Sequence, residues 1–188
     1  MRHWVAGLTV AALLASVAAW AQDPNTTSET MAVPAGYRQW VFLTSSLDLN
    51  YATTATPGHH MLDNVFVDPA SYAAFLKTGT WPEGAVLIKE NRMAESAGTL
   101  SKAGHFQADV MNLEIHIKDG KRFAGKWSFF VSADGKAPGD LRPQSANCYS
   151  CHQDHGAVDT TFVQFYPTLM PIAKAKGTLS ASYLKEAN

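Results

Sequence analysis

Hydrophobic and polar side chains alternate most regularly between Gln107 and Lys118. Successive side chains of a β-strand point to opposite sides of a sheet, so this alternation predicts a strand with one apolar face. Glu114 lies on the more polar of the two faces. That face comprises Val110, Asn112, Glu114, His116 and Lys118, and the apolar face comprises Met111, Leu113, Ile115 and Ile117.

Further strands are predicted from runs of aromatic and β-branched residues at 37–44, 61–67, 86–90 and 127–131. For 37–44 the sequence also allows a short helix that leads into the strand. The intervening segments are polar or rich in glycine and proline, which is typical of loops. They span residues 45–58, 94–104 and 134–143.

Helices are predicted at two places. Asp68 followed by Pro69 is a favourable helix start, because aspartate caps the first turn and proline suits the first helical position. Gly79 is a typical helix end. Shorter helical pieces are predicted within 161–176, with interruptions at Pro167 and Pro171. Together the elements predict an α+β fold, mainly an antiparallel β-sheet with flanking helices.

The first residues have the pattern of an export signal. Arg2 supplies a positive charge, an apolar run follows from Val5 to Ala19, and Ala19-Trp20-Ala21 resembles a cleavage site. The run is shorter than the ~20 apolar residues of a membrane-spanning helix, so cleavage is favoured over an anchor. We expect a signal peptide over 1–21, a flexible leader over 22–32 and one domain over 33–188, located in the periplasm without a membrane span.

The charge balance narrows the choice of partners. The formal net charge is −1. This balance gives no broad basic surface of the kind that binds nucleic acid or an anionic membrane. We therefore expect no nucleic-acid partner.

Both cysteines of the chain lie in the motif Cys148-Tyr149-Ser150-Cys151-His152. Two thiols at this spacing can add to the two vinyl groups of one haem, and the histidine that follows is placed to ligate the iron. We expect one covalently attached haem c, bound by Cys148 and Cys151, with His152 as the iron ligand.

Three other interpretations compete for the two cysteines: a redox-active dithiol, half of a zinc site, and a small structural disulfide. A redox dithiol is usually found early in the chain, after a first strand, whereas this motif lies near the C-terminus. A zinc site would need two further ligands, and only His155 is near. The export signal favours haem, because this motif receives haem outside the bacterial cytoplasm.

The position of the motif restricts the class of cytochrome. Small electron-transfer cytochromes c bind haem near the N-terminus, and the four-helix cytochromes c′ are helical before the motif. Here predicted strands precede the motif and only a short segment follows His152. We therefore expect a C-terminal helical segment that carries the haem beside a sheet.

The C-terminal segment resembles the cytochrome P-460 family, which includes the cytochromes c′-beta. The specific part is the haem motif followed by His155, Asp159 and Phe162-Val163-Gln164-Phe165-Tyr166-Pro167. Weaker similarity is found at Tyr37–Val41, Val67–Tyr72, Thr78-Gly79, Pro82–Gly84 and Val86–Glu90. The resemblance extends from about Tyr37 to Leu169.

This resemblance implies a homodimer with a mainly antiparallel sheet and a five-coordinate haem iron. It places His152 at the proximal ligand and the two cysteines at the thioether attachments. Lys89 falls on the lysine that is covalently linked to the porphyrin edge in the P-460 branch. Glu114 falls on a distal acidic position that could relay protons. The resemblance therefore implies catalytic roles for Lys89 and Glu114.

Two functions follow from the two branches. A P-460-like protein oxidises hydroxylamine, with nitric oxide as a further candidate substrate, and passes electrons to an external acceptor. A cytochrome c′-beta lacks the cross-link, binds nitric oxide in an apolar aromatic pocket and has no turnover; Phe66, Phe75 and Phe106 are the available aromatics. Active P-460 members carry an arginine where this chain has Asp63. A simple electron carrier, the third hypothesis, would need six-coordinate iron.

The candidate residues also have structural interpretations. Lys89 could be an edge-strand lysine that faces solvent, and Glu114 could belong to the polar face of a half-solvated strand. Several histidines and methionines are candidates for a sixth iron ligand. We interpret them as surface, loop or core residues. They are His59, His60, His105, His116, Met61, Met93, Met111 and Met170.

Overall fold

The computed structural model describes residues 29–49, 60–96, 103–123 and 126–187. The expected signal peptide and the leader residues 22–28 lie outside this part of the chain. Within it, one antiparallel sheet has the strand order β1-β7-β6-β5-β4-β3-β2. The strands are β1 (Thr30–Met31), β2 (Val41–Leu47), β3 (His60–Val67), β4 (Val86–Glu95), β5 (Phe106–Lys118), β6 (Trp127–Ser132) and β7 (Gly139–Leu141).

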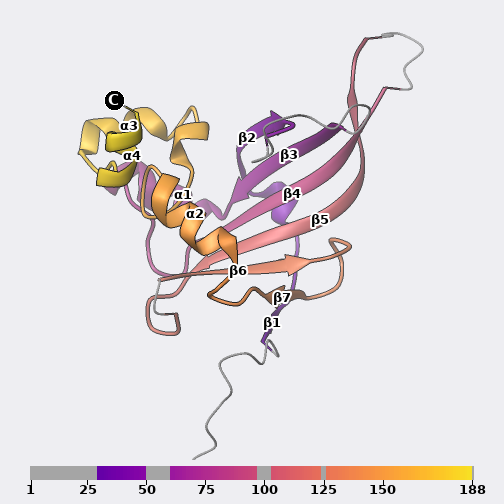
Figure 1. Ribbon diagram of the computed structural model, residues 1–188, viewed down its shortest axis with the longest axis horizontal. Helices are drawn as coiled ribbons and strands as arrows, with labels where there is room; N and C mark the ends of the chain where they lie inside the picture. The colour runs from indigo at the N-terminus through magenta and orange to yellow at the C-terminus, as the bar shows by residue number, and fades with distance from the viewer. Residues whose placement is uncertain (1–28, 50–59, 97–102, 124–125, 188) are drawn as a thin grey trace, which may run out of the picture.

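Helices flank the sheet and are concentrated in the C-terminal part of the chain (Figure 1). They are η1 (Tyr37–Gln39), α1 (Pro69–Thr78), α2 (Asn147–His155), η2 (Val163–Phe165), α3 (Met170–Lys176) and α4 (Ala181–Glu186). This architecture confirms the α+β prediction. None of the helices in the described part of the chain is long and apolar enough to cross a membrane.

Strand β5 has the two faces that its alternation predicts. Leu113 and Ile115 are fully buried on one side, where they form a core with Ile88 and Phe130 beneath Tyr37. Glu114 and His116 lie on the other side and line a cavity. In the register with β4, Glu114 stands directly opposite Lys89, so the two side chains share one face of the sheet.

The cavity side of the sheet is partly covered by a second core. Val67 and Leu87 of the sheet pack in this core with Phe75 of α1. The C-terminal segment adds Val158 and Leu169, both fully buried. These contacts fix the segment that bears the haem motif against the strands.

Helix α1 begins and ends as the sequence predicts. Asp68 accepts a hydrogen bond from the backbone N–H of Ser71 at 2.9 Å, and Pro69 occupies the first helical position. The other carboxylate oxygen of Asp68 accepts from the backbone N–H of Val86 at 3.1 Å, which ties the helix start to β4. Gly79 ends the helix in the left-handed conformation, with φ of 77°.

The structure differs from the sequence-based predictions at several boundaries. The short helix that the sequence allowed before the first strand is present as η1, and β2 continues to Leu47 into the predicted loop 45–58. Strand β4 continues to Glu95 because its pairing with the long β5 extends beyond the apolar stretch. Thr30 and Met31, expected in the leader, pair with Asp140 and Gly139 inside the predicted loop 134–143.

The C-terminal helices also differ from expectation. Pro171 lies in the first turn of α3, where its missing N–H would have no partner in any case, so it starts a helix instead of interrupting one. Helix α4 was not predicted. Its cap is Ser180, whose hydroxyl accepts from the backbone N–H of Tyr183 at 3.1 Å.

Candidate functional site

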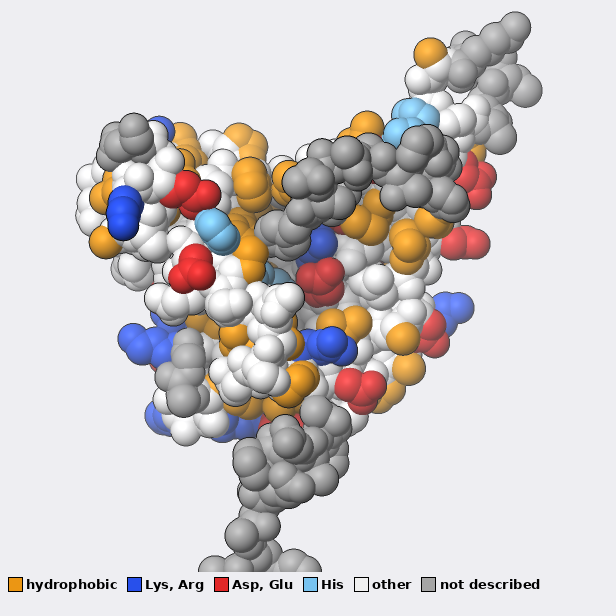
Figure 2. Space-filling view, in the orientation of Figure 1, with side chains coloured by type: hydrophobic (Ala, Val, Ile, Leu, Met, Phe, Trp, Pro, Cys, Tyr) orange, Lys and Arg blue, Asp and Glu red, His pale blue; other side chains and the backbone are white. Residues whose placement is uncertain are grey.

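A cavity of about 550 Å³ lies between the C-terminal segment and one face of the sheet. Figure 2 shows the molecule hollowed between the C-terminal helices and the strands. Strands β2 to β5 supply the polar wall, and α2, η2 and α4 supply residues of the facing wall. The cavity brings together His152, Cys148, Lys89 and Glu114, all of which the sequence singles out.

His152 is buried on α2 and is held in one orientation. Its Nδ1 atom lies 2.8 Å from the carbonyl oxygen of Thr160. A carbonyl oxygen only accepts hydrogen bonds, so Nδ1 carries the hydrogen and Nε2 keeps its lone pair for a metal. The ring also packs on Phe162 and Phe129, with centroids 4.3 and 4.6 Å apart.

The imidazole of His152 is neutral near pH 7. Burial, reinforced by the neighbouring His116, lowers its pKa from 6.5 to about 3. Only a neutral imidazole can donate a lone pair to iron. The surroundings of His152 therefore favour the form that binds a metal.

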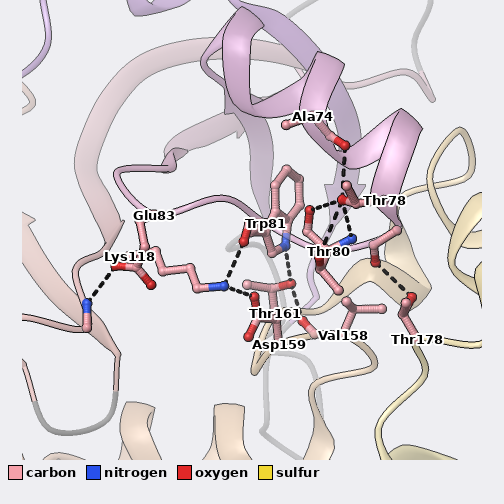
Figure 3. A network of polar contacts seen from close by, with 12 residues as sticks. Ala74, Thr78, Thr80, Trp81, Glu83, Lys118, Val158, Asp159, Thr161 and Thr178 are labelled. Atoms are coloured by element: carbon pink, nitrogen blue, oxygen red, sulfur yellow. Dashed lines mark hydrogen bonds and ion pairs between the residues drawn. The ribbon is translucent and has the colours of Figure 1, made fainter.

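The turn that carries Thr160 is fixed by a separate polar network (Figure 3). Lys118, almost fully buried, is ion-paired with Asp159 and donates to the carbonyl oxygen of Trp81 at 2.7 Å. The indole N–H of Trp81 in turn donates to Thr161 Oγ1 at 2.8 Å. The network therefore holds the two residues on either side of Thr160.

This turn has an unusual backbone. Asp159 and Thr160 have φ values of 54° and 57°, in the left-handed region that few residues other than glycine adopt. Gly156, at the end of α2, allows the turn to approach closely. A Cβ atom added at Gly156 would lie 2.6 Å from the carbonyl oxygen of His152 and 2.7 Å from the carbonyl carbon of Thr160.

The two cysteines lie on successive turns of α2. Both are free thiols and both are partly buried. Cys148 lines the cavity, whereas Cys151 is not among the lining residues. Burial raises the pKa of the Cys148 thiol.

Lys89 is surrounded by carboxylates. Its Nζ atom lies 3.3 Å from Oε1 of Glu114 and 3.8 Å from Oδ2 of Asp63. Strand β4 lies between β3 and β5, and Lys89 lines the cavity. The interpretation of Lys89 as an edge-strand lysine is therefore wrong.

Glu114 is held in its ionised form. Burial by itself would raise its pKa, but the neighbouring His116, with Nε2 3.9 Å from Oε2, and the charge of Lys89 outweigh it and hold the pKa well below the usual range. Asn91 adds a hydrogen bond to Oε1 at 3.0 Å. Glu114 thus faces the cavity as a carboxylate with several donors around it.

His116 and Asp63 are among the cavity residues to which the sequence gave no site role. His116, interpreted as a surface or loop histidine, instead packs against the ring of His152, with centroids 5.1 Å apart. Asp63 was noted only as a departure from the family, yet it lines the cavity and is 1% exposed. The register of the strands, which the sequence does not reveal, brings both residues to the same wall as Lys89.

Other residues named from the sequence lie elsewhere. Phe66, Phe75 and Phe106 do not line the cavity. His60 is paired with Asp48, with Nδ1 2.6 Å from Oδ2, and His105 contacts the ring of His60. None of Met61, Met93, Met111 and Met170 lines the cavity, and His59 is outside the described residues.

The residues present fit a haem. His152 offers a neutral imidazole with its second nitrogen anchored, and Cys148 offers a thiol in the same cavity. Aromatic rings of Phe162, Phe165 and Tyr166 supply apolar surface for a flat macrocycle. A volume of about 550 Å³ is within the range of cofactor pockets.

Comparisons with known proteins agree with this chemistry. A family model described as Cytochrome P460 matches residues 34–163, which is more than half of the chain. A search of curated proteins finds no match. The matched region contains strands β2 to β7 of the sheet and the haem motif with its histidine. The chain therefore belongs to the cytochrome P460 family, and its cofactor is haem c.

Proposed function

We propose that this haem c cytochrome oxidises hydroxylamine at a haem linked to Lys89, with nitric oxide as a further substrate. The observation that supports the proposal is the position of Lys89. Its amino group lies in the same cavity as His152 and Cys148, beside the carboxylate of Glu114. A haem attached through Cys148 would share this cavity with the amino group of Lys89. We propose that this amino group bonds to the edge of the porphyrin.

The protein contributes binding and orientation. When bound, haem c supplies an iron that accepts electrons from the nitrogen compound and passes them to an external acceptor. Cys148 and Cys151 would attach it, and Nε2 of His152 would bind its iron. The hydrogen bond from Nδ1 of His152 to Thr160 fixes the direction of that ligand.

Glu114 would receive protons from the substrate. The oxidation of hydroxylamine to nitric oxide releases protons and electrons in equal number, so a base beside the substrate is required. Glu114 faces the cavity in its ionised form, with one oxygen 3.3 Å from Lys89. A bond between Lys89 and the porphyrin would remove the ammonium charge that holds the pKa of Glu114 down, and Glu114 would then be a stronger base.

The polar wall favours turnover over simple nitric-oxide binding. Lys89, Glu114 and Asp63 line the sheet side of the cavity, while the aromatic lining residues Phe162, Phe165 and Tyr166 come from the C-terminal segment. Charged and hydrogen-bonding groups can move protons, which a purely apolar pocket cannot. A nitric-oxide binding protein without turnover is the alternative that the experiment below separates.

The test is oxidation of hydroxylamine by the haem-loaded protein with a dye as electron acceptor. Lys89→Arg keeps a positive charge but lacks the amino group, and Lys77→Arg on α1 is the matched control. We expect turnover in the wild type and in Lys77→Arg, and loss of turnover in Lys89→Arg with haem still attached. Equal turnover in all three, or nitric-oxide binding without oxidation, would contradict the proposal.

The location, the oligomeric state and the electron acceptor of the protein are also part of the proposal. We propose a periplasmic homodimer that donates electrons to an external acceptor protein. The mass of the secreted protein would show removal of residues 1–21, and light scattering would give the oligomeric state. An uncleaved N-terminus would contradict the first expectation, and a monomer would contradict the second.

A further inference from the structure

We propose that Asp63 is a second proton-accepting carboxylate of this cavity, which takes over protons that Glu114 receives from the substrate. This inference rests on the proposed function, because that reaction releases the protons. It assigns a role to a residue at which the family resemblance predicts a different side chain. The supporting observations are its position, its burial and its missing hydrogen bonds.

The carboxylate of Asp63 is buried and poorly solvated. The residue is 1% exposed, and Oδ1 has no hydrogen-bond partner among the described residues. Oδ2 accepts one long hydrogen bond, from Oγ of Ser46 at 3.3 Å. Buried polar atoms in native proteins are rarely unpaired, and a carboxylate in this situation binds a proton readily.

Glu114 has the opposite surroundings. Its Oε1 accepts from Lys89 at 3.3 Å and from Asn91 at 3.0 Å, and its Oε2 lies 3.9 Å from Nε2 of His116. The two donors, Lys89 and Asn91, and the nearby His116 favour the ionised form, whereas Asp63 accepts only the hydrogen bond from Ser46 among the described residues. When the surroundings of two carboxyl groups differ in this way, one can act as the base and the other can hold the proton. Here Glu114 is the base and Asp63 holds the proton.

Lys89 connects the two carboxylates. Its Nζ atom lies 3.8 Å from Oδ2 of Asp63 and 3.3 Å from Oε1 of Glu114. The other charged group that acts on Asp63 is Asp48, next to the end of β2, whose negative charge disfavours ionisation. Burial is the largest influence on Asp63 and raises its pKa, and the negative charge of Glu114 acts in the same direction.

Linkage of Lys89 to haem would strengthen this arrangement. The positive charge of Lys89 is the main influence that lowers the pKa of Asp63. Once that charge is removed, two carboxylates would face one cavity, and one of them would hold a proton. The more buried side chain, Asp63, is the one for which the neutral form is favoured.

The experiment compares Asp63→Asn with Glu114→Gln and with Asp140→Asn, an exposed control on β7. All are prepared as haem-loaded protein, and kcat and KM for hydroxylamine are measured from acid to alkaline pH. General acid–base groups contribute about 10²- to 10⁴-fold to rate, so we expect kcat of Asp63→Asn to fall about 10²-fold with KM little changed. Asp140→Asn should match the wild type. A wild-type pH profile and kcat in Asp63→Asn would overturn the proposal.

An infrared difference spectrum between reduced and oxidised protein tests Asp63 without turnover. We expect a band of a protonated carboxyl group in the wild type that is missing in Asp63→Asn and retained in Glu114→Gln. If the wild type lacks the band, the role of Asp63 is wrong even when hydroxylamine is oxidised. If the band is present without hydroxylamine oxidation, the proposed function fails and the proton-holding role of Asp63 is supported.

Ser46→Ala gives an independent check if Asp63→Asn fails to fold. Ser46 makes the described hydrogen bond to the ionised carboxylate, so its removal should move the titration of the carboxyl band to higher pH. An unchanged titration would overturn the assignment of the band to Asp63.

Discussion

The carbonyl oxygen of Thr160 lies 2.8 Å from Nδ1 of His152 and fixes which nitrogen of the imidazole faces the cavity. Thr160 can do so because its turn adopts a left-handed backbone that the fold holds in place. His152, the proposed iron ligand, and the turn eight residues further along the chain are therefore coupled. Changes in this turn should alter the haem environment although none of the residues 156–161 lines the cavity.

Gly156→Ala tests the close packing behind His152. The added Cβ would meet the carbonyl groups of His152 and Thr160 at less than 3 Å, so the turn must shift. We expect a loss of about 1–3 kcal/mol in the free energy of unfolding, as for other overpacked sites. Thermal unfolding measures the loss, and the midpoint potential of the haem should change with it.

Gly120→Ala is the matched control, because its Cβ would meet nothing closer than 3.4 Å. Equal stability and potential in the two variants would show that the turn does not position His152.

Lys118 and Asp159 form the ion pair that anchors the same turn. Lys118→Met removes this pair and the hydrogen bond to Trp81, so we expect a loss of about 1.5–3 kcal/mol in the free energy of unfolding. Asp159→Asn should cost less, because the amide still accepts one hydrogen bond. Urea unfolding of both single variants and the double variant gives the coupling energy. Strictly additive losses would mean that the pair does not interact.

Much of the fold could be predicted from the sequence, because its signals are local. The alternation around Glu114 and the Asp68 cap with Pro69 specify their elements through neighbouring residues. Strand β7 and helix α4 were missed. The three residues of β7 have no apolar pattern of their own and are held by pairing with β6 and β1, while α4 depends on a serine cap and on contacts with α2.

Only the part of the candidate site that has a local sequence signal could be predicted. Cys148 and His152 belong to one short motif, so the sequence reveals them directly. Asp63 and His116 join the site through strand register and through the packing of α2 on the sheet. Those relationships link distant residues, and a single sequence has no signal for them.

A cluster on the opposite face of the sheet should make stability depend on pH. The hydroxyl of Tyr37 donates to Oε2 of Glu90, and Arg38 donates to the same oxygen at 2.8 Å. Burial and then Glu90 raise the pKa of Tyr37 from 10.0 to about 12. The folded state therefore keeps the tyrosine proton at a pH where the unfolded chain loses it. This contribution is present below pH 10 and is lost as the pH rises towards 12.

Glu90 produces the opposite dependence. Burial would raise its pKa, but hydrogen bonds from Arg92, Tyr37 and Arg38 outweigh it and lower the pKa. Its contribution is present above the unfolded pKa of about 4.3 and is lost as the pH falls through the lowered value. Urea unfolding across pH should show a smaller alkaline loss in Tyr37→Phe and a smaller acid loss in Glu90→Gln. Unchanged pH profiles would contradict both assignments.

The two cysteines should attach one haem by separate bonds. Cys148→Ser and Cys151→Ser each leave one thiol on α2, so we expect haem to stay with the chain on a denaturing gel in both single variants. In the double variant the proposed bond to Lys89 is the remaining covalent link, so haem should stay with the chain and should be released when Lys89→Arg is added. Haem staining of the gel measures this. Retention of haem by the triple variant would contradict these assignments, because it would show that a residue other than Cys148, Cys151 and Lys89 binds the macrocycle covalently.

The optical spectrum of the ferrous protein, produced in a host with a cytochrome c maturation system, tests the central claim most directly. A bond between Lys89 and the porphyrin edge changes the electronic system of the macrocycle, so we predict a strongly red-shifted Soret band that is absent in Lys89→Arg. An ordinary five-coordinate ferrous haem c spectrum in the wild type would contradict the linkage and, with it, hydroxylamine oxidation at a lysine-modified haem.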